Sequence, residues 1–424
     1  MQKIRHLTVI TLTLILLIGS TNVALNSCSH KKSGELHASV EKELQNYESN
    51  RSTFLVSKFQ KLLFTERYSA EIISLEKASE NVVVNQTKAN KLSGKRITIL
   101  ITGLDSRLGE GHSHPHADAN HVVSLWLDEG KAEVISIPRD TPANAGFHDT
   151  SGLNKLTNVR ANRGRNTYHK EVVRISGVPK INHYIEFGFS QAMGLLELLG
   201  FQDNAKSTLQ SLRSRHSYGI GDFQRSYNQG QFIRQMILKQ TPSLDDGIMT
   251  GILLRGALLL VDTDLSSEQA SSYLMQMKSK GFGKKEDIVV RMKPSMKMQV
   301  TAFDFTDPNV VAALQKQNDR TASKQKTSKK TGDEMSGQIV SKLEKLLTSS
   351  KRNLPKNPKA VVGQLEPYFK QRAWLQVTTI SQRATLRSEF GLQLTQAYTL
   401  LKKSDQAEKV RTIIDAEEKA FKRN

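Results

Sequence analysis

Cysteine is almost missing from this chain, which has Cys28 alone among 424 residues. One cysteine cannot form an intramolecular disulfide, so the fold cannot rest on a disulfide framework. Histidines alternate in a glycine-containing loop, at positions 112, 114 and 116, but no cysteine accompanies them. This argues against a zinc site. No Gly-Lys-Ser/Thr follows the glycines of the loop, which excludes a P-loop for nucleotides.

Acidic residues are few relative to basic ones, with 41 Asp and Glu against 61 Lys and Arg and a formal net charge of +20. Such an excess predicts attraction to polyanions, and nucleic acid, anionic lipid headgroups and phosphate-bearing glycans all fit it. The sequence has no recognised nucleic-acid-binding motif and no aromatic stacking platform. We therefore do not expect nucleic acid among its partners.

The N-terminal segment 1–28 has the pattern of an export signal. A basic start is followed by an apolar run from Leu7 to Ile18 and by a small-residue stretch that ends at Cys28. The segment from Leu25 to Cys28 resembles a bacterial lipobox, whose cysteine carries the lipid after cleavage. An uncleaved membrane anchor and a buried helix with an inert cysteine are the alternatives. Both membrane interpretations place the rest of the chain at the extracytoplasmic face of the cell membrane.

The middle of the chain has the patterns of a helical segment followed by a mixed domain. Residues 35–92 combine charged and apolar residues at helical spacing, which predicts a helical stalk. Within 95–310, short β-branched and aromatic runs predict strands at 96–102, 121–127, 132–137 and 181–187. Helical patterns lie between and after them, at 167–176, 190–199, 225–239 and 266–280. This mixture predicts an α/β core.

The last part of the chain differs in composition. Residues 315–337 are almost free of apolar side chains, which predicts a solvated basic linker. Residues 338–424 contain at least three helical runs and few strand signals, which predicts a C-terminal all-α domain. One stretch has the spacing of a single tetratricopeptide-like hairpin, but one repeat cannot bury its face alone. A plain helical bundle is therefore favoured, with a possible role in recruiting a protein partner.

Charged residues gather in four islands at or near the ends of the predicted strands, where open α/β sheets place their sites. The islands are GLDSR at 103–107, HADA at 116–119, SIPRDT at 136–141, and a run from Arg213 to Gln229 that contains RSR and GDFQR. A single Asp–Arg pair is more often a surface ion pair than a catalytic one. The islands therefore form a functional site only if the fold brings them together in space.

Together, the four islands contain the parts of a pyrophosphate site. The carboxylates of Asp105 and Asp118 can hold an octahedral Mg²⁺, or Mn²⁺, that takes its other ligands from water and phosphate oxygens. Arginines can fork onto those oxygens, and the candidates are Arg107, Arg139, Arg213, Arg215 and Arg225. A further carboxylate, Asp140 or Asp222, is available to take the proton from an attacking hydroxyl, and the sequence does not choose between them.

The order of these motifs resembles the LytR-CpsA-Psr family of cell-wall ligases, from about Arg96 to Lys280, and SIPRD with the GDFQR helix entry is its most specific part. The resemblance implies an α-β-α fold with a long apolar pocket for a polyprenyl chain and the pyrophosphate at its mouth. It implies metal binding by Asp105 and Asp118. It implies headgroup roles for the five arginines, with Asp222 and Gln229 beside them and Lys155 at the position of a family lysine.

The chain departs from the family pattern at two cationic positions. An arginine and a hydroxyl are replaced in His116-Ala117-Asp118-Ala119, and a second arginine after GDFQR is replaced by Asn228. The sequence therefore leaves two functions open.

The first, which the family resemblance implies, is an extracytoplasmic transferase that moves a glycan phosphate from a polyprenyl pyrophosphate carrier to peptidoglycan or another wall polymer. The second is a protein that binds or tethers lipid-linked glycan without chemistry, which the loss of two cations motivates.

Overall fold

The computed structural model describes residues 79–84, 92–106, 108–109, 114–202, 204–214, 221–242, 247–324 and 332–422. The chain divides into two compact units, 1–71 and 72–424, and everything described here belongs to the second. Cys28, the export segment and most of the predicted stalk lie outside the described residues, as do Arg107 and Arg215. Among the helices that are described, none combines the length and hydropathy needed to cross a bilayer.

A mixed six-stranded sheet forms the centre of the described unit, with the strand order β6-β5-β2-β3-β4-β7. The strands are β2 (Arg96–Asp105), β3 (His116–Trp126), β4 (Lys131–Ser136), β5 (His183–Phe187), β6 (Asp262–Thr263) and β7 (Ile288–Met292). The three central strands β2, β3 and β4 are antiparallel neighbours, while β5 and β7 add to them in parallel. Most residues of β2 and β3 are buried, including polar ones such as Thr102, Asn120 and His121, because both faces of the sheet are covered.

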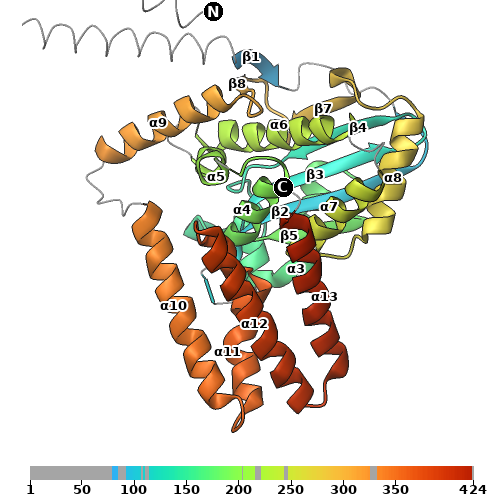
Figure 1. Ribbon diagram of the computed structural model, residues 1–424. Helices are drawn as coiled ribbons and strands as arrows, with labels where there is room; N and C mark the ends of the chain where they lie inside the picture. The colour runs from blue at the N-terminus through green and yellow to red at the C-terminus, as the bar shows by residue number, and fades with distance from the viewer. Residues whose placement is uncertain are drawn as a thin grey trace, which may run out of the picture. The chain divides into compact units, whose positions relative to one another are not determined.

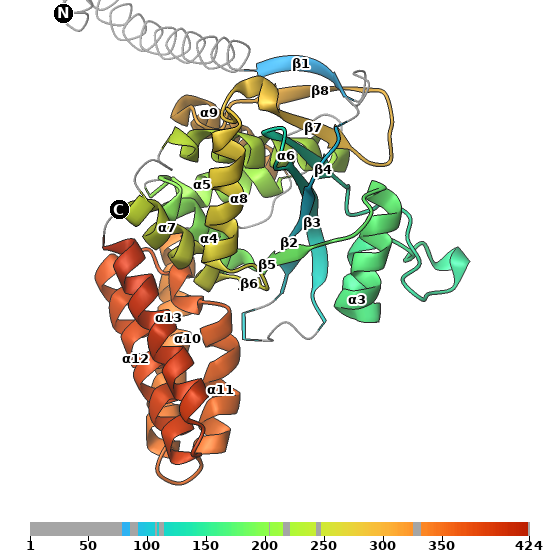
Figure 2. The ribbon, with the colours of Figure 1, turned by 90° about the vertical axis from the view of Figure 1, so that its right-hand side faces the viewer.

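Helices cover both faces of the sheet, which confirms the predicted α-β-α architecture (Figure 1). On one face lies α3 (Leu156–Ser176), seen by itself beside the sheet in Figure 2. The other face carries α4 (Phe189–Leu198), α5 (Ala205–Arg213), α6 (Asp222–Gln240), α7 (Gly247–Leu260) and α8 (Ser267–Ser279). Helix α3 is longer than the predicted helix at 167–176. Its backbone departs from helical geometry at Gly164, with φ 76° and ψ 175°. This break interrupts the helical pattern in the sequence, so the first half of the helix is not predicted.

A second, two-stranded sheet pairs β1 (Ser79–Val84) with β8 (Met298–Phe303) in antiparallel register. Strand β1 lies inside the range 35–92 in which a helical stalk is predicted, so for these six residues the structure differs from the prediction. The local reason is the run Val82–Val84, whose β-branched side chains favour extended backbone. Its pairing partner lies more than two hundred residues away along the chain and is invisible to local periodicity.

The segment predicted as a linker at 315–337 is partly helical. Helix α9 (Pro308–Lys324) runs through its first residues, and α10 begins at Gly332. The start of α9 is anchored because Val310, Val311 and Leu314 pack with Leu212 of α5. The polar residues that follow continue the helix from this packed first turn, although their composition is that of a linker.

The C-terminal region is all-helical as predicted, with α10 (Gly332–Asn353), α11 (Pro358–Lys370), α12 (Ile380–Leu400) and α13 (Ser404–Phe421). A short 3₁₀ turn, η4 (Ala373–Gln376), lies between α11 and α12. Trp374 of this turn is fully buried, and its ring centroid lies 5.6 Å from that of Phe369 and 5.7 Å from that of Phe390. The four helices therefore share one aromatic-centred core.

Candidate active site at the mouth of an apolar cavity

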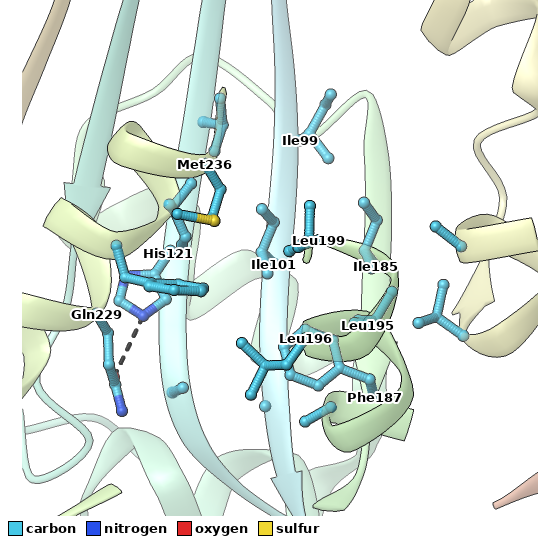
Figure 3. Close-up of a pocket in the computed structure, with 18 of the residues that line it drawn as sticks. Ile99, Ile101, His121, Ile185, Phe187, Leu195, Leu196, Leu199, Gln229 and Met236 are labelled. Carbon is cyan, nitrogen blue, oxygen red and sulfur yellow. Dashed lines mark hydrogen bonds between the residues drawn. The ribbon is translucent and has the colours of Figure 1, made fainter. Parts of the chain in front are cut away.

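A cavity of about 430 Å³ lies between the sheet and the helices α4 to α8. Side chains of alternate strand residues form its floor, including Ile99 and Ile101 of β2 and Ile185 of β5 (Figure 3). Helix α4 contributes Leu195 and Leu196, and the remaining walls come from α5 to α8. Nearly all of this lining is apolar, so the cavity suits a hydrocarbon ligand rather than a polar one.

Four charged residues line the same cavity, all from the islands identified in the sequence. They are Asp105, Asp118, Arg213 and Arg225. Asp105 is the last residue of β2, Arg213 ends α5, and Arg225 lies in the first turn of α6. The structure therefore brings three islands that are distant in sequence to one end of the sheet, as predicted from their positions at element ends.

A β-bulge places the carboxylate of Asp118. Gly103 pairs with Ala119 across β2 and β3, but Leu104 pairs with Ala117, so Asp118 is the extra residue on β3. A bulged residue leaves the pairing ladder and bends its strand, which re-aims its side chain. Asp118 and Asp105 thus reach the same cavity although ordinary alternation along β3 would not predict it.

Asp118 is the centre of the polar contacts at the mouth. Its Oδ1 accepts a hydrogen bond from Arg139 Nη1 at 2.5 Å and lies 3.4 Å from the hydroxyl of Thr157. Its backbone carbonyl lies 3.3 Å from Arg225 Nη2. Arg139 follows β4 in the SIPRD motif, so a fourth island joins the site through this ion pair, which is partly shielded from water.

The two other candidate arginines that the structure describes, Arg213 and Arg225, each lie near a carboxylate. Arg225 is almost fully buried and forms an ion pair with Asp222, one turn earlier on α6. Arg213 is half-exposed, with Nη2 3.8 Å from Asp105 Oδ1 and its guanidinium 5.0 Å from the ring centre of Phe189. The mouth therefore alternates positive and negative groups instead of presenting one sign.

Asp140 and Lys155 lie beside the mouth rather than in the cavity lining. Lys155 Nζ is 3.4 Å from Asp140 Oδ1, and Arg139 Nε is 3.9 Å from the same oxygen. Both side chains are more than a third exposed. These two predicted residues therefore form the outer, solvent-facing part of the polar cluster.

His121 is a polar residue of the cavity that the sequence analysis did not select. Its Nδ1 lies 2.9 Å from the hydroxyl of Ser136, and its Nε2 lies 3.3 Å from Gln229 Oε1 (Figure 3). Because an amide oxygen can only accept, Nε2 carries the proton and Nδ1 accepts from Ser136. Burial lowers the pKa of His121 to about 4, so the imidazole is neutral at physiological pH.

The hydrogen bonds of His121 orient Gln229. The amide nitrogen of Gln229 donates to the carbonyl of Leu212 at 2.9 Å, so Ser136, His121 and Gln229 form one chain that ends at α5. Helix α6 approaches β4 closely here, since a Cβ at Gly230 would lie 2.3 Å from Ser136 Oγ. A signal was present in the sequence: His121 alternates with Val123 and Leu125, which line the same cavity.

A hard divalent cation fits the chemistry of the two carboxylates at the mouth. Across the described part of the chain no group of three or more His, Cys, Asp or Glu side chains is arranged to hold a metal. Of the described residues, Asp105 and Asp118 would hold the ion, and Mg²⁺ commonly binds through one or two carboxylates with water and phosphate oxygens completing its octahedron. Since Asp118 is engaged by Arg139, a cation would share that carboxylate with the arginine.

An α-β-α sandwich with a charged mouth on an apolar cavity is the class of structure that the resemblance to the LytR-CpsA-Psr family implies. Residues 63–200 match the model of the LytR_cpsA_psr family. The resemblance to the LytR-CpsA-Psr family is therefore confirmed over a stretch that includes Asp105, Asp118 and Arg139. The match ends before Arg213 and the GDFQR motif, which the structure brings to the same cavity.

Solved structures of low identity are also similar to this chain. B. subtilis TagV is 17% identical, with 54% of this chain and 98% of that chain covered and a TM-score of 0.39. The protein gbs0355 from Streptococcus agalactiae is 16% identical, with 56% and 90% covered and a TM-score of 0.38. TagT bound to LI-WTA is 15% identical, with 56% and 95% covered and a TM-score of 0.36. A search of curated proteins gives no match.

Proposed function

We propose that this protein is an extracytoplasmic transferase that moves a glycan phosphate from a polyprenyl pyrophosphate carrier to a hydroxyl of peptidoglycan or another wall polymer. In general terms, the family match supports a transferase of cell-wall glycopolymers. The observation that carries the finer proposal is the joining of an apolar cavity to a mouth lined by Asp105, Asp118, Arg213 and Arg225. A polyprenyl pyrophosphate has the same two parts, a long hydrocarbon and a compact polyanion.

The cavity wall would hold the hydrocarbon and set the depth at which the pyrophosphate stops. Burial stabilises bound isoprenoid units by about 25 cal/mol per Å² of apolar surface, so the polyprenyl group provides affinity without specifying the glycan. Neutral His121, with both ring nitrogens hydrogen-bonded, adds no charge to this wall. Gln229 is fixed beside it and can offer its carboxamide to the headgroup.

The arginines at the mouth would neutralise charge that develops on the leaving phosphate. Arg213 is accessible enough to fork onto phosphate oxygens, while Arg225 and Arg139 are already fixed by carboxylates and need no reorganisation. Held by Asp105 and Asp118, Mg²⁺ or Mn²⁺ would supply further charge neutralisation on the phosphate oxygens. Phosphoryl transfer depends mainly on such positioning and electrostatics.

The transfer itself replaces one P–O bond by another. The acceptor hydroxyl oxygen bonds to the glycan-linked phosphorus, the P–O bond to the bridging oxygen breaks, and polyprenyl phosphate leaves. The hydroxyl proton passes to a carboxylate, for which Asp140 beside Arg139 and Asp222 beside Arg225 are the candidates. Asp140 is the more exposed of the two, which suits an acceptor arriving from solvent.

The N-terminal pattern completes the proposal by placing the protein at the membrane that contains the carrier. Cys28 as a lipidated residue, or the apolar run as an anchor, would keep the cavity near lipid-linked donors. Either attachment gives an extracytoplasmic location, where the wall acceptor also lies.

The test is release of polyprenyl phosphate from a synthetic polyprenyl pyrophosphate glycan, with and without Mg²⁺. We expect metal-dependent release by the protein and loss of release in Asp118→Ala. Glu171→Ala is the matched control, because Glu171 makes a surface ion pair on α3, on the far face of the sheet. Release that persists unchanged in Asp118→Ala would contradict the proposal.

A binding or tethering protein is the second candidate, which the two family cations replaced in this sequence motivate, although the positions of both replacements reduce their weight. His116 pairs with Asp105 across β2 and β3 and is exposed, so a protonated imidazole could stand in for one cation. Asn228 is fully buried and lies outside the cavity lining, so the second replacement removes no charge from the wall. Tight binding of the lipid-linked glycan without release, with or without metal, would establish this alternative.

A further inference from the structure

The C-terminal helices share residues with the wall of the cavity. Leu195 of α4, Ala257 of α7 and Val261 line the cavity, and the same three residues pack against the core of the C-terminal helices. Trp374 and Leu375 are fully buried members of that core. The wall formed by α4 and α7 is thus one helix layer thick, with the cavity on one side and the C-terminal core on the other.

Buried hydrogen bonds tie this layer to the C-terminal helices. Gln191 of α4 donates to the carbonyl of Leu260 at 2.7 Å and to that of Lys370, the last residue of α11, at 3.2 Å. Arg372 donates to the carbonyl of Leu259 at 2.7 Å. A Cβ at Gly194 of α4 would lie 2.7 Å from Leu375, so the two parts are in close contact. Such contacts fix both helices of the wall against the C-terminal core.

The same helices hold the loop that follows Asp105. The backbone N–H of Gly109 donates to Gln371 Oε1 at 2.7 Å, and Lys342 Nζ donates to the carbonyl of Leu108 at 3.3 Å. The Leu108 side chain packs against the C-terminal core. Gly109 has φ +89°, and a Cβ there would lie 2.3 Å from the ring of Tyr368. Glycine is therefore required by both the backbone conformation and the closeness of Tyr368.

From these contacts we infer that the C-terminal helices are a positioning element of the donor site, with Gln371 and Lys342 as positioning residues for the Asp105 loop. This rests on the proposed function, because Asp105 matters only if the mouth binds a pyrophosphate with its metal. Among the described residues, none from α10 to α13 lines the cavity or its charged mouth. The C-terminal helices act by fixing the backbone on which Asp105 stands and by supporting the wall from behind.

The inference is tested in the full chain with Gln371→Ala and Lys342→Met. Lys345→Met is the matched control, since Lys345 is an exposed lysine of the same helix, one turn further along. For Gln371→Ala we expect kcat for polyprenyl phosphate release to fall roughly tenfold, because a small misplacement of a catalytic group is costly. The Mg²⁺ concentration for half-maximal rate should rise, while KM for the lipid should stay near that of the unaltered protein. Lys342→Met should show the same pattern at smaller size.

Amide hydrogen exchange at Gly109 gives a readout that does not depend on catalysis. We expect exchange at this amide to accelerate in Gln371→Ala and to stay unchanged in Lys345→Met. If the unaltered protein releases no polyprenyl phosphate, the proposed function fails, and faster exchange with weaker Mn²⁺ binding would still establish the positioning role. If Gln371→Ala folds and leaves exchange, Mn²⁺ binding and any release unchanged, the inference is overturned.

A second pair of variants addresses the contact with Tyr368. Gly109→Ala should lower release and Mn²⁺ affinity, because the added Cβ meets the Tyr368 ring. Gly109→Ala combined with Tyr368→Ala removes that clash and should recover part of the loss, leaving the strain of a positive φ. Failure of the double variant to recover any release or Mn²⁺ affinity, with its thermal unfolding unchanged, would contradict the role given to the close packing of Gly109 against Tyr368.

Discussion

The two faces of the central sheet use similar residues for different purposes. On the α3 face, Leu100 of β2 is fully buried and packs with Leu156 and Tyr168 in a closed core. On the opposite face, Ile99 and Ile101 of the same strand border the cavity. Adjacent residues of one apolar strand thus serve folding on one side and a ligand cavity on the other. Hydrophobicity alone cannot distinguish the two, because the difference is set by how closely the covering helices approach.

The largest expected effect is on polyprenyl phosphate release, and it distinguishes residues of the charged mouth from residues on the α3 face. Arg213→Ala should reduce polyprenyl phosphate release by about 100-fold, because an arginine that neutralises the leaving group is lost. Its half-exposed side chain means that folding should hardly change. Arg174→Ala, which removes an exposed ion pair on α3, should leave release unchanged. Steady-state kinetics with a synthetic donor checks both, and equal losses in the two variants would contradict the assignment of the mouth.

The next effect compares neighbouring residues of β2. Leu100→Ala should lower the free energy of unfolding by about 3 kcal/mol, because it opens a void in a closed core. Ile101→Ala, which enlarges a cavity that already exists, should cost about 1 kcal/mol and weaken lipid binding. Urea unfolding of both variants measures the difference. Equal costs would show that the two faces are packed alike.

The pH dependence of stability should reveal His121. Its pKa is lowered to about 4 in the folded protein from 6.5, so the unfolded chain binds the proton more readily. The stabilisation from a neutral buried imidazole is thus fully present above about pH 6.5 and is lost as pH falls toward 4. The expected loss is on the order of 3 kcal/mol. Urea unfolding between these pH values should show this slope for the unaltered protein and a flatter one for His121→Gln.

The smallest effect is on ligand affinity alone. Ile185→Trp would fill part of the cavity from β5, and we expect about tenfold weaker binding of a polyprenyl phosphate. Stability should change little, since the added ring enters existing space. Val122→Trp is the contrasting variant, because Val122 is fully buried on the α3 face and overpacking there should destabilise the fold. Fluorescence-detected lipid binding and thermal unfolding distinguish the two outcomes, and unaltered affinity in Ile185→Trp would place the ligand elsewhere.

Much of the fold could be predicted from periodicity because its signals are local. The four predicted strands correspond to β2, β3, β4 and β5, and the four predicted helices overlap α3, α4, α6 and α8. Strands β7 and β8 were not predicted, since their short runs become strands only by pairing with β4 and with β1 from distant sequence. Helix α7 was not predicted, because periodicity alone does not distinguish its apolar sequence from a buried strand.

The candidate site could be predicted in part for a similar reason. Asp105, Asp118 and Arg225 stand at or near element ends, a position that sequence patterns reveal, and the structure places all three on one cavity. The contacts of Gly109 with Gln371 and Tyr368 could not be foreseen, because they join residues more than two hundred positions apart. His121 was missed because its polar partners, Ser136 and Gln229, come from two other elements.

The bulge at Asp118 separates strand pairing from ligand binding within strand β3. Its neighbours Ala117 and Ala119 carry the register with β2, while Asp118 is the residue that the register does not require. Chemistry at this position is therefore separable from architecture: a different side chain could replace the carboxylate and the strands would still be aligned. A mouth built in this way can exchange its ligand-binding group in a single step, and the same scaffold could serve donors with different headgroups.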